Sequence, residues 1–187
     1  MGNSPRVMND YCIMVTGLPA SGKTTIGREL AKRLSIPFLD KDDYLEKLYD
    51  DRGTGGRERR TKLSLESNDL FQADAVAYPQ VVLVSHWRPK RSGGPSGTPT
   101  AWLESSFQRV IELYCACPVE TAAKRFSTRQ RHPGHLDKNR ELGEIVEWMG
   151  RYRTHLPIGI GRLMMVNSAD QIDHDQILSE IQMEVSK

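Results

Sequence analysis

Apolar residues follow two alternating patterns along the chain, and each pattern predicts a different kind of element. Short continuous apolar runs are typical of buried strands, and the first of them covers residues 11–16. Between the runs, apolar residues recur every three or four positions, which is helical spacing. Strands are predicted at 11–16, 35–39, 81–85, 110–116 and 163–166, and helices at 22–34, around 45–48, and at 63–78, 101–107, 118–126, 139–152 and 173–185, the last with its cap near Asp170 or Asp173.

This alternation predicts an α/β fold whose mostly parallel sheet is covered by helices on both faces. The 187 residues contain neither an internal repeat nor a domain-splitting linker, so residues 1–187 are expected to form one domain. Two segments have the composition of loops. Residues 50–62 are broken by glycine and rich in arginine, and residues 90–100 alternate glycine with proline.

The composition indicates the compartment of the protein more clearly than its reaction. The net charge of +2 favours no class of partner, so any electrostatic argument has to be local. Cys12, Cys115 and Cys117 lie within or beside apolar runs, which is typical of reduced thiols rather than of a disulfide framework. No apolar run approaches membrane-spanning length, and the first ten residues lack the apolar core of a signal peptide. We therefore expect a cytoplasmic protein without a membrane partner.

The segment after the first predicted strand carries the strongest chemical signal. Residues 17–24 read GLPASGKT and match the phosphate-binding P-loop pattern G-x-x-x-x-G-K-[ST] without deviation. Its glycines let consecutive backbone N–H groups point at phosphate oxygens, beside the positive N-terminal end of the next helix. Lys23 is expected to bridge the β- and γ-phosphates of ATP, and the Thr24 hydroxyl to ligate Mg²⁺. The other reading is a glycine turn before an amphipathic helix. Nucleotide contacts are predicted for Gly17, Leu18, Pro19, Ala20, Ser21, Gly22, Lys23, Thr24 and Thr25.

Three stretches together resemble the small P-loop kinases: GLPASGKTT, FLDKDD after the second predicted strand, and CPVETAAKRFSTRQRH further on. That group includes shikimate and gluconate kinases, chloramphenicol phosphotransferase, the zeta-toxin family and the kinase half of polynucleotide kinase. The resemblance covers nearly the whole chain in element order. It implies a P-loop NTPase fold with a five-stranded parallel sheet in the order 2-3-1-4-5. It also implies a mobile lid at about residues 125–152.

Two carboxylates follow the second predicted strand, at the edge of the sheet where ligands bind in open α/β folds. Similar kinases have D-x-D at this place, which matches Asp40-Lys41-Asp42. The resemblance implies that Asp40 supports the Mg²⁺ shell and that Asp42 faces the acceptor hydroxyl as a base. The alternative is a solvated acidic turn that caps the next helix, with Asp43 as the best cap.

Three arginines lie in the part of the chain that corresponds to the lid. In similar kinases one arginine stacks on adenine and a later one reaches the transferring phosphoryl group. The resemblance therefore implies Arg125 for the adenine and Arg129 or Arg131 for the phosphoryl group. Arginine suits both tasks because its planar fork grips phosphate oxygens at two points and stacks on rings. The alternative is a solvated basic helix face.

The acceptor side is predicted less sharply. His86, Trp87 and Arg88 close the third predicted strand at the same edge, where they are candidates for the acceptor wall, and His86 is a rival to Asp42 as the base. A strand-end tryptophan is also typical of a core. Arg57, with Arg59 and Arg60, is a candidate for an anionic acceptor or simply part of a loop. His132 and His135 are too isolated in the sequence to predict a metal site.

These features predict an ATP-dependent kinase that transfers a phosphoryl group from Mg-ATP to a hydroxyl of a small molecule, such as an antibiotic, a sugar, a metabolite or a nucleotide. A polynucleotide 5′-hydroxyl kinase is an alternative, although the chain lacks a separate basic and aromatic platform for a nucleic acid strand. A switch module that hydrolyses ATP slowly is another, but it would need neither the D-x-D pair nor a basic lid. A monomer or weak dimer is expected.

Overall fold

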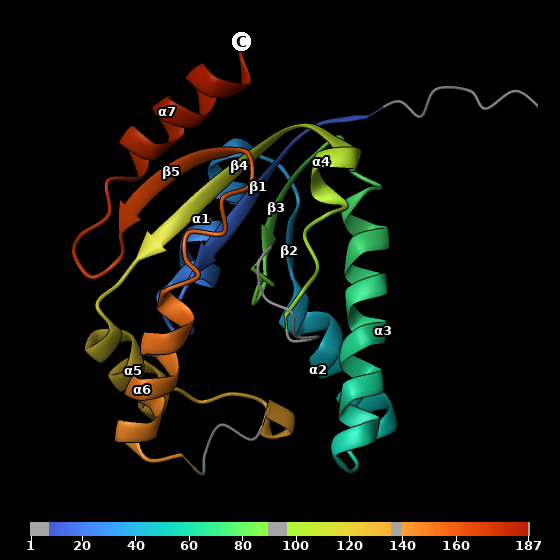
Figure 1. Cartoon of the computed structure of the whole chain (residues 1–187). Coiled ribbons are helices and arrows are strands. Elements are labelled where there is room, and N and C mark those ends of the chain that lie inside the picture. The colour runs from blue at the N-terminus through green and yellow to red at the C-terminus, as the bar shows by residue number, and fades with distance from the viewer. Residues whose placement is uncertain (1–7, 90–96, 136–139, 187) are drawn as a thin grey trace, which may run out of the picture.

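The computed structural model describes residues 8–89, 97–135 and 140–186. Within these residues the strands form a parallel sheet of five members in the order β2-β3-β1-β4-β5 (Figure 1). This order confirms the predicted fold class, and it places the strand that precedes the P-loop at the centre of the sheet. The strands are β1 (Asn9–Gly17), β2 (Phe38–Asp40), β3 (Gln80–Val84), β4 (Phe107–Ala116) and β5 (Arg162–Asn167).

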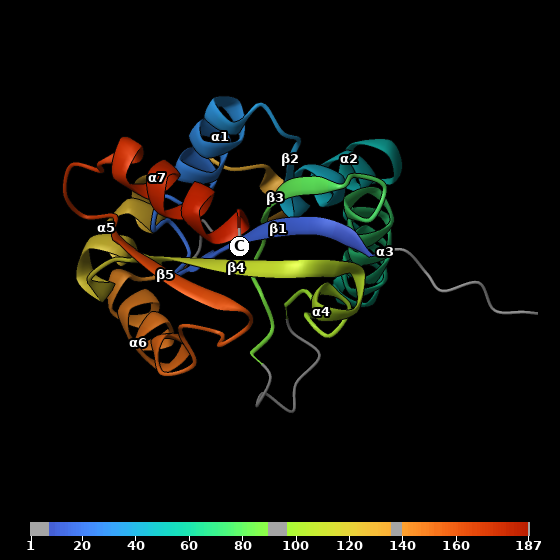
Figure 2. The same cartoon turned by 90° about the horizontal axis from the view of Figure 1, so that it is seen from above.

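Helices connect the strands and cover both faces of the sheet, as predicted. Figure 2 shows α1 and α7 on one face and α3 and α4 on the other. The final helix begins after Asp173, whose side chain accepts the N–H groups of Asp175 and Gln176 as a cap. The helices are α1 (Lys23–Leu34), α2 (Lys41–Arg52), α3 (Arg57–Ala75), α4 (Leu103–Ser106), α5 (Val119–Thr128), α6 (Leu142–Arg153) and α7 (His174–Val185), with a 3₁₀ turn, η1, at Pro133–His135.

Alternate side chains of β1 serve two separate cores. Ile13 and Val15 pack in the core that contains residues of α1 and α7, whereas Cys12 and Met14 pack in the core that contains residues of α3 and α4. Because both faces are buried, the strand is a continuous apolar run rather than an alternating one. All three cysteines are buried free thiols, as the sequence predicted.

A third core lies beyond the carboxyl edge of the sheet, where α5 and α6 pack together. Leu18 of the P-loop contributes to it beside Phe126 of α5 and Met149 of α6. In Figure 1 this pair of helices stands on one side of the carboxyl edge, α2 and α3 stand on the other, and η1 lies between them. The P-loop therefore faces a space that is flanked by two helical layers.

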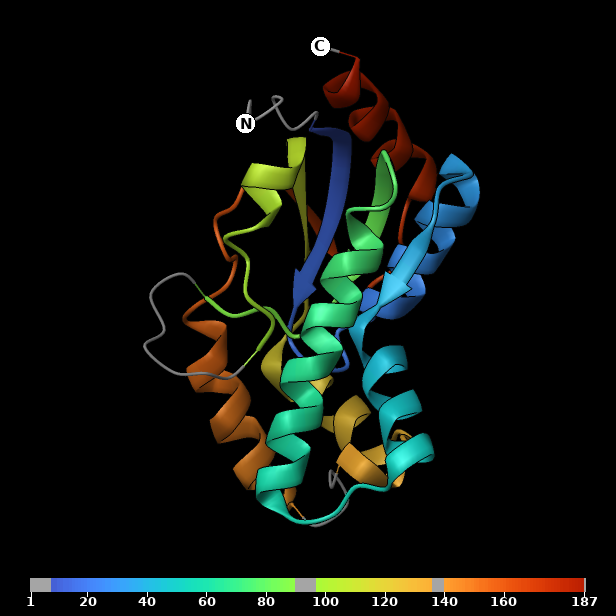
Figure 3. The ribbon, with the colours of Figure 1, turned by 90° about the vertical axis from the view of Figure 1, so that its right-hand side faces the viewer.

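The predicted loop at residues 50–62 is wrong for most of its length. α2 continues to Arg52 and α3 begins at Arg57, so only a short glycine-rich connection separates them. The arginines and glutamate that suggested a loop are good helix formers, and tertiary packing holds them in place. Glu58 pairs with Lys62 one turn on, and Arg52 reaches Glu66 at 2.8 Å to join the two helices. Figure 3 shows α3 running along the sheet as one long helix.

Residues 90–96 of the second predicted loop lie outside the described residues. Its described end is anchored, because Thr98 bridges to Trp87 and its hydroxyl bonds to Ser85 and Asn68 in the interior. Among the described helices none is long and apolar enough to cross a membrane.

Candidate active site

The P-loop follows directly from β1, and its backbone requires glycine at both ends. Gly17 has a φ of 142° and Gly22 a φ of 91°, a region that glycine adopts without strain. A Cβ on Gly17 would lie 2.7 Å from the carbonyl oxygen of Cys115 on β4, so only glycine fits there. No side chain caps the start of α1, which leaves its first backbone N–H groups open to a ligand.

Lys23 at the start of α1 folds back over the P-loop. Its Nζ donates to the carbonyl oxygens of Gly17 at 3.2 Å and Leu18 at 2.8 Å. Burial lowers the pKa of Lys23 to about 8, although Asp40 and Asp42 act in the opposite direction. The buried Ser21 hydroxyl has no hydrogen-bond partner within the described residues. A loop with open backbone N–H groups and an ammonium group fits a chain of phosphates.

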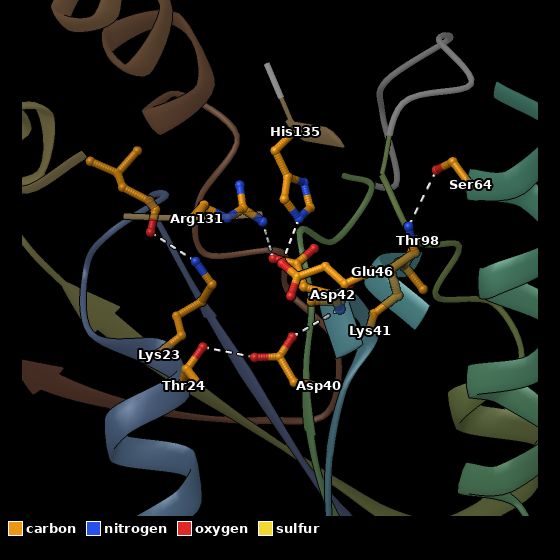
Figure 4. Close-up of polar contacts among 12 residues, drawn as sticks. Lys23, Thr24, Asp40, Lys41, Asp42, Glu46, Ser64, Thr98, Arg131 and His135 are labelled. Carbon is orange, nitrogen blue, oxygen red and sulfur yellow. Dashed lines mark hydrogen bonds and ion pairs between the residues drawn. The ribbon is translucent and has the colours of Figure 1, made fainter. Parts of the chain in front are cut away.

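Thr24 and Asp40 meet although they come from different elements (Figure 4). The Thr24 hydroxyl donates to Asp40 Oδ2 at 2.8 Å, and Asp40 Oδ1 accepts the backbone N–H of Asp42 at 3.1 Å. Asp40 therefore caps α2, and the suggestion of Asp43 as the cap is wrong. Burial, with the charge of Asp42 beside it, raises the pKa of Asp40 to about 6. A hydroxyl and a carboxylate are oxygen ligands of the kind that Mg²⁺ prefers, so this donor pair fits that ion.

Asp42 is held by an arginine from far along the chain. Its carboxylate forms an ion pair with Arg131, which lies 89 positions later in the sequence. Burial on its own would raise the pKa of Asp42, but the positive charge of Arg131, together with His135 and Lys41, lowers it below its ordinary value. Asp42 is therefore an ionised carboxylate on the cavity wall. Its partner is one of the two arginines that the resemblance selected for the phosphoryl group.

His86 stands just beyond β3 on the same wall. Its ring lies 4.4 Å from that of Tyr152 on α6, measured between ring centroids. Burial lowers the pKa of His86 to about 4, and the charge of Lys23 acts in the same direction. The imidazole is thus neutral at physiological pH.

These groups surround one cavity of about 770 Å³, a volume within the usual range for small-molecule sites. It is lined by Pro19, Ala20, Gly22, Lys23, Thr24, Thr25, Asp40, Asp42, Val84, Ser85, His86, Arg125, Phe126, Arg129, Arg131, His135 and Trp148. Gly17, Leu18 and Ser21 lie behind this wall.

Arg125 and Arg129 come to the cavity from the end of α5. Arg125 Nη1 donates to the carbonyl oxygen of Ser168 in the loop after β5, at 3.1 Å. The guanidinium carbon of Arg129 lies 4.2 Å from the centre of the Phe126 ring. The structure thus brings all three predicted lid arginines to one cavity.

Three candidates for the acceptor wall do not line this cavity. Trp87 is buried in the core, where its indole N–H donates to the carbonyl oxygen of Val15 at 2.9 Å. Arg88 turns toward the segment that follows residue 96 and donates to Gly97. Arg57 is exposed at the start of α3, in a segment that was predicted to be a loop and is a helix. Just beyond the end of β3, Trp87 is buried in the core, whereas His86, one residue earlier, lines the cavity.

Other lining residues were not singled out from the sequence. Ser85 precedes His86, Phe126 fits the buried side of α5, and Trp148 comes from α6. Trp148 lies three positions after Ile145 and four before Tyr152, so its spacing indicated a core residue and gave no sign of the cavity. His135 also lines the cavity, and its partner is Glu46 on α2 at 2.7 Å.

Known proteins agree with this architecture. Residues 13–146 match a family described as an AAA domain, and the chain belongs to that family. A shikimate kinase from Paracidovorax citrulli is 54% identical over 76 residues, which are 39% of this chain and 42% of the relative. One from Psychrobacter arcticus is 32% identical over 130 residues, covering 65% of this chain and 62% of the relative. The chain thus matches less than two thirds of the length of either relative.

A solved structure extends the similarity over the whole fold. A candidate kinase from Chloroflexus aurantiacus j-10-fl superposes with a TM-score of 0.76 at 25% identity, covering 94% of this chain and 98% of that one. Together with the shikimate kinase relatives, it confirms the resemblance to the small P-loop kinases, a class that binds nucleotides through the P-loop.

Proposed function

We propose that this protein is an ATP-dependent kinase that transfers the γ-phosphoryl group of Mg-ATP to a hydroxyl of a small molecule. The observation that carries the proposal is the convergence of the P-loop, the Asp40–Asp42 pair and the lid arginines on one cavity. A nucleotide switch needs the first of these groups and neither of the others. The kinship with shikimate kinases supports a small acceptor over a polynucleotide.

On the nucleotide side, the P-loop N–H groups and Lys23 would hold the phosphates, and Arg125 would cover the base. Thr24 and Asp40 would supply two ligands to Mg²⁺, with water and phosphate oxygens completing the shell as is usual for this ion. Bound Mg-ATP supplies a phosphoryl group whose leaving-group charge is neutralised by the metal. Lys23 would exchange its two carbonyl contacts for phosphate oxygens, at little cost because both partners are hydrogen-bond acceptors.

On the acceptor side, Asp42 would orient the attacking hydroxyl. The acceptor oxygen forms a bond to the γ-phosphorus as the bond to the β–γ bridging oxygen breaks, ADP leaves, and the hydroxyl proton passes to the Asp42 carboxylate. The lowered pKa makes Asp42 a weak base, so it would take the proton late, once the new bond has acidified the hydroxyl. His86 is the alternative base, and Asp42 is preferred because it stands at the second position of the D-x-D pattern and contacts Arg131, the residue proposed for the transferring group.

Arg129 and Arg131 would stabilise the charge on the transferring group, the usual task of arginine in this chemistry. Arg131 contacts Asp42 directly, which favours it over Arg129 as the residue next to the acceptor. We further propose that residues 125–152 move as a lid on a single domain.

The test is ADP release from ATP with a panel of hydroxyl compounds, measured above the water background. The panel begins with shikimate and includes gluconate, nucleosides, an aminoglycoside and a 5′-hydroxyl oligonucleotide. Transfer to one small acceptor supports the proposal. Release that is the same with every acceptor and with water alone supports a switch, and release only with the oligonucleotide supports the polynucleotide kinase.

A further inference from the structure

Residues 131–135 lie against a single face of α2. The face consists of Asp42, Glu46, Tyr49 and Asp50, which we call the α2 stripe. Their spacing of four, seven and eight positions from the first member places all of them on one side of a helix. Figure 4 shows two of them, Asp42 and Glu46, turned toward Arg131 and His135. Three of the four members are acidic, and the segment opposite them is basic.

Each basic side chain of the segment meets one carboxylate of the stripe. Arg131 pairs with Asp42, His132 Nε2 lies 3.0 Å from Asp50 Oδ1, and His135 Nε2 lies 2.7 Å from Glu46 Oε1. The His135–Glu46 contact is shielded from water, since its side chains are 9% and 33% exposed, whereas the His132–Asp50 contact lies at the surface because the Asp50 side chain is 71% exposed. Shielding makes a polar contact stronger than the same contact on an open surface.

His132 uses both of its ring nitrogens. Its Nδ1 accepts the backbone N–H of Gly134 at 3.1 Å. In the neutral ring the hydrogen is therefore on Nε2, which donates a hydrogen bond to Asp50 Oδ1. The carbonyl oxygen of His132 accepts the N–H of His135, also at 3.1 Å. The segment is therefore folded into a compact turn before it meets α2.

Tyr49 is the surface on which this turn rests. Its buried ring stacks on His132, with centroids 5.7 Å apart and planes 19° apart, and meets His135 edge-on at 6.1 Å. A Cβ on Gly134 would fall 2.3 Å from Tyr49 Cδ2 and 2.9 Å from Thr54 Cγ2. The turn approaches the ring so closely that it leaves no room for a side chain.

We infer that the α2 stripe, with Tyr49 at its centre, positions Arg131 for phosphoryl transfer. Asp42 itself would touch the substrate, whereas Glu46, Tyr49 and Asp50 are positioning residues that act through the turn. The inference rests on the proposed function. Arginine has a long side chain with considerable rotamer entropy, and the ion pair with Asp42 together with the fixed backbone of the turn removes much of that freedom in advance. A charge held in place before the reaction stabilises a transition state better than one that has to be ordered during it.

The first arm of the test needs no acceptor. Hydrogen–deuterium exchange of residues 129–135 is measured in the full-length protein and in variants at Tyr49. Tyr49→Leu keeps an apolar side chain against Leu45 and Leu63 but removes the stacked ring, and we expect exchange of the turn amides to rise by about tenfold or more. Tyr49→Phe keeps the ring and should restore the wild-type rate. Lys47→Ala, on an exposed position of the same helix, is the matched control.

The second arm measures transfer to shikimate, or to whichever compound of the panel reacts fastest. Gly134→Ala introduces the clash with Tyr49, so kcat/KM for the acceptor should fall by about tenfold while the dissociation constant of ATP changes by less than about twofold. Gly143→Ala on α6, where a Cβ meets nothing within 4 Å, controls for the substitution itself. In a Tyr49→Leu background the further loss caused by Gly134→Ala should shrink to about twofold, since the ring that it strikes is gone.

The outcomes separate the two proposals. If Tyr49→Leu and Gly134→Ala accelerate exchange and leave transfer unchanged, the stripe is only structural and the inference is overturned. If the wild type transfers to no acceptor, the proposed function fails and the positioning role fails with it, whatever the exchange rates. Restoration of both exchange and transfer by Tyr49→Phe, but not by Tyr49→Leu, would support the inference.

Discussion

The two sides of the cavity are built in different ways. The phosphate side comes from one continuous stretch, in which β1, the P-loop and the start of α1 follow each other without interruption. The acceptor side is assembled from separate segments, namely the start of α2, the end of β3, the turn at 131–135 and α6. The first side is a local consequence of glycine conformation and helix termini. The second exists only once distant parts of the chain have folded together.

This difference predicts that substitutions on the two sides should affect different steps of the reaction. A change on the phosphate side should alter nucleotide affinity directly, because its donors are backbone groups and one lysine. A change on the acceptor side should alter transfer more than binding, because its groups hold each other in place across the cavity. The Asp42–Arg131 pair is the clearest case, because its two charged residues are 89 positions apart in the sequence.

The largest effect is expected from the phosphate side. Lys23→Ala removes the ammonium that contacts the P-loop carbonyls, and turnover should fall by about a thousandfold or more as nucleotide binding weakens. The fold should persist, since Lys23 stands at the first turn of α1 rather than in a core. Steady-state rates and thermal unfolding provide the check, with Lys32→Ala on the exposed side of α1 as the control. Wild-type ATP consumption in Lys23→Ala would end the kinase assignment.

The next effect tests the acceptor side. Asp42→Asn keeps the shape of the side chain but removes its charge, and transfer should fall by about 10²–10⁴-fold, the usual range for a positioned acid–base group. ATP affinity should stay nearly unchanged. Asp40→Asn should instead raise the Mg²⁺ concentration needed for half-maximal rate, because it would act through the metal.

The measurements for these variants are transfer rate, ATP affinity and metal titration, with exposed Asp43→Asn as the matched control. Equal transfer by the wild type and Asp42→Asn would remove Asp42 from the reaction and leave His86 as the base.

The same contrast explains what the sequence predicted. The P-loop followed from a short sequence pattern, and the strand order and the meeting of Thr24 with Asp40 followed from the family resemblance, which placed both residues at Mg²⁺ although β3 lies between their strands. The start of α3 at Arg57 was missed because glycines 53, 55 and 56 suggested a longer break than they make. Charge density alone does not distinguish a loop from an exposed helix.

The acceptor side was predicted only in part. Asp42 and Arg131 were each candidates, but nothing in the sequence indicated that they form a pair, because a contact across 89 positions leaves no local pattern. His132 and His135 looked isolated for the same reason, and their partners Asp50 and Glu46 lie on another helix. Trp87 and His86 differ by one residue, and only the packing of β3 decides which of them faces the cavity.

A smaller effect should come from Arg125, and it tests whether this residue contacts the base or the phosphates. Arg125→Ala removes the guanidinium that is fixed by Ser168 beside the cavity, so ATP should bind about 1–2 kcal/mol more weakly if that group covers the base. The maximal transfer rate should change little. Isothermal titration with ATP and with free triphosphate distinguishes a base contact from a phosphate contact. An equal loss for both ligands would place Arg125 at the phosphates instead.

The last effect concerns His86 and should be seen in stability rather than in activity. The pKa of His86 is about 4 in the folded protein and 6.5 for an unperturbed histidine, so between these values the unfolded chain binds more protons. The contribution of His86 to the free energy of unfolding should therefore rise with pH from about 4 to about 6.5 and then level off, and it amounts to about 2 kcal/mol between about pH 5 and about pH 7.5. Burial lowers the pKa of His135 as well and acts in the same direction, whereas the pKa of Asp40, raised to about 6, acts in the opposite direction, so the comparison has to be between variant and wild type. His86→Gln cannot take up this proton, and its unfolding free energy measured in urea should depend less steeply on pH than that of the wild type. Parallel curves for the two proteins would show that the imidazole is solvated in the folded state, and the acceptor wall would then be more open than the buried contact with Tyr152 indicates.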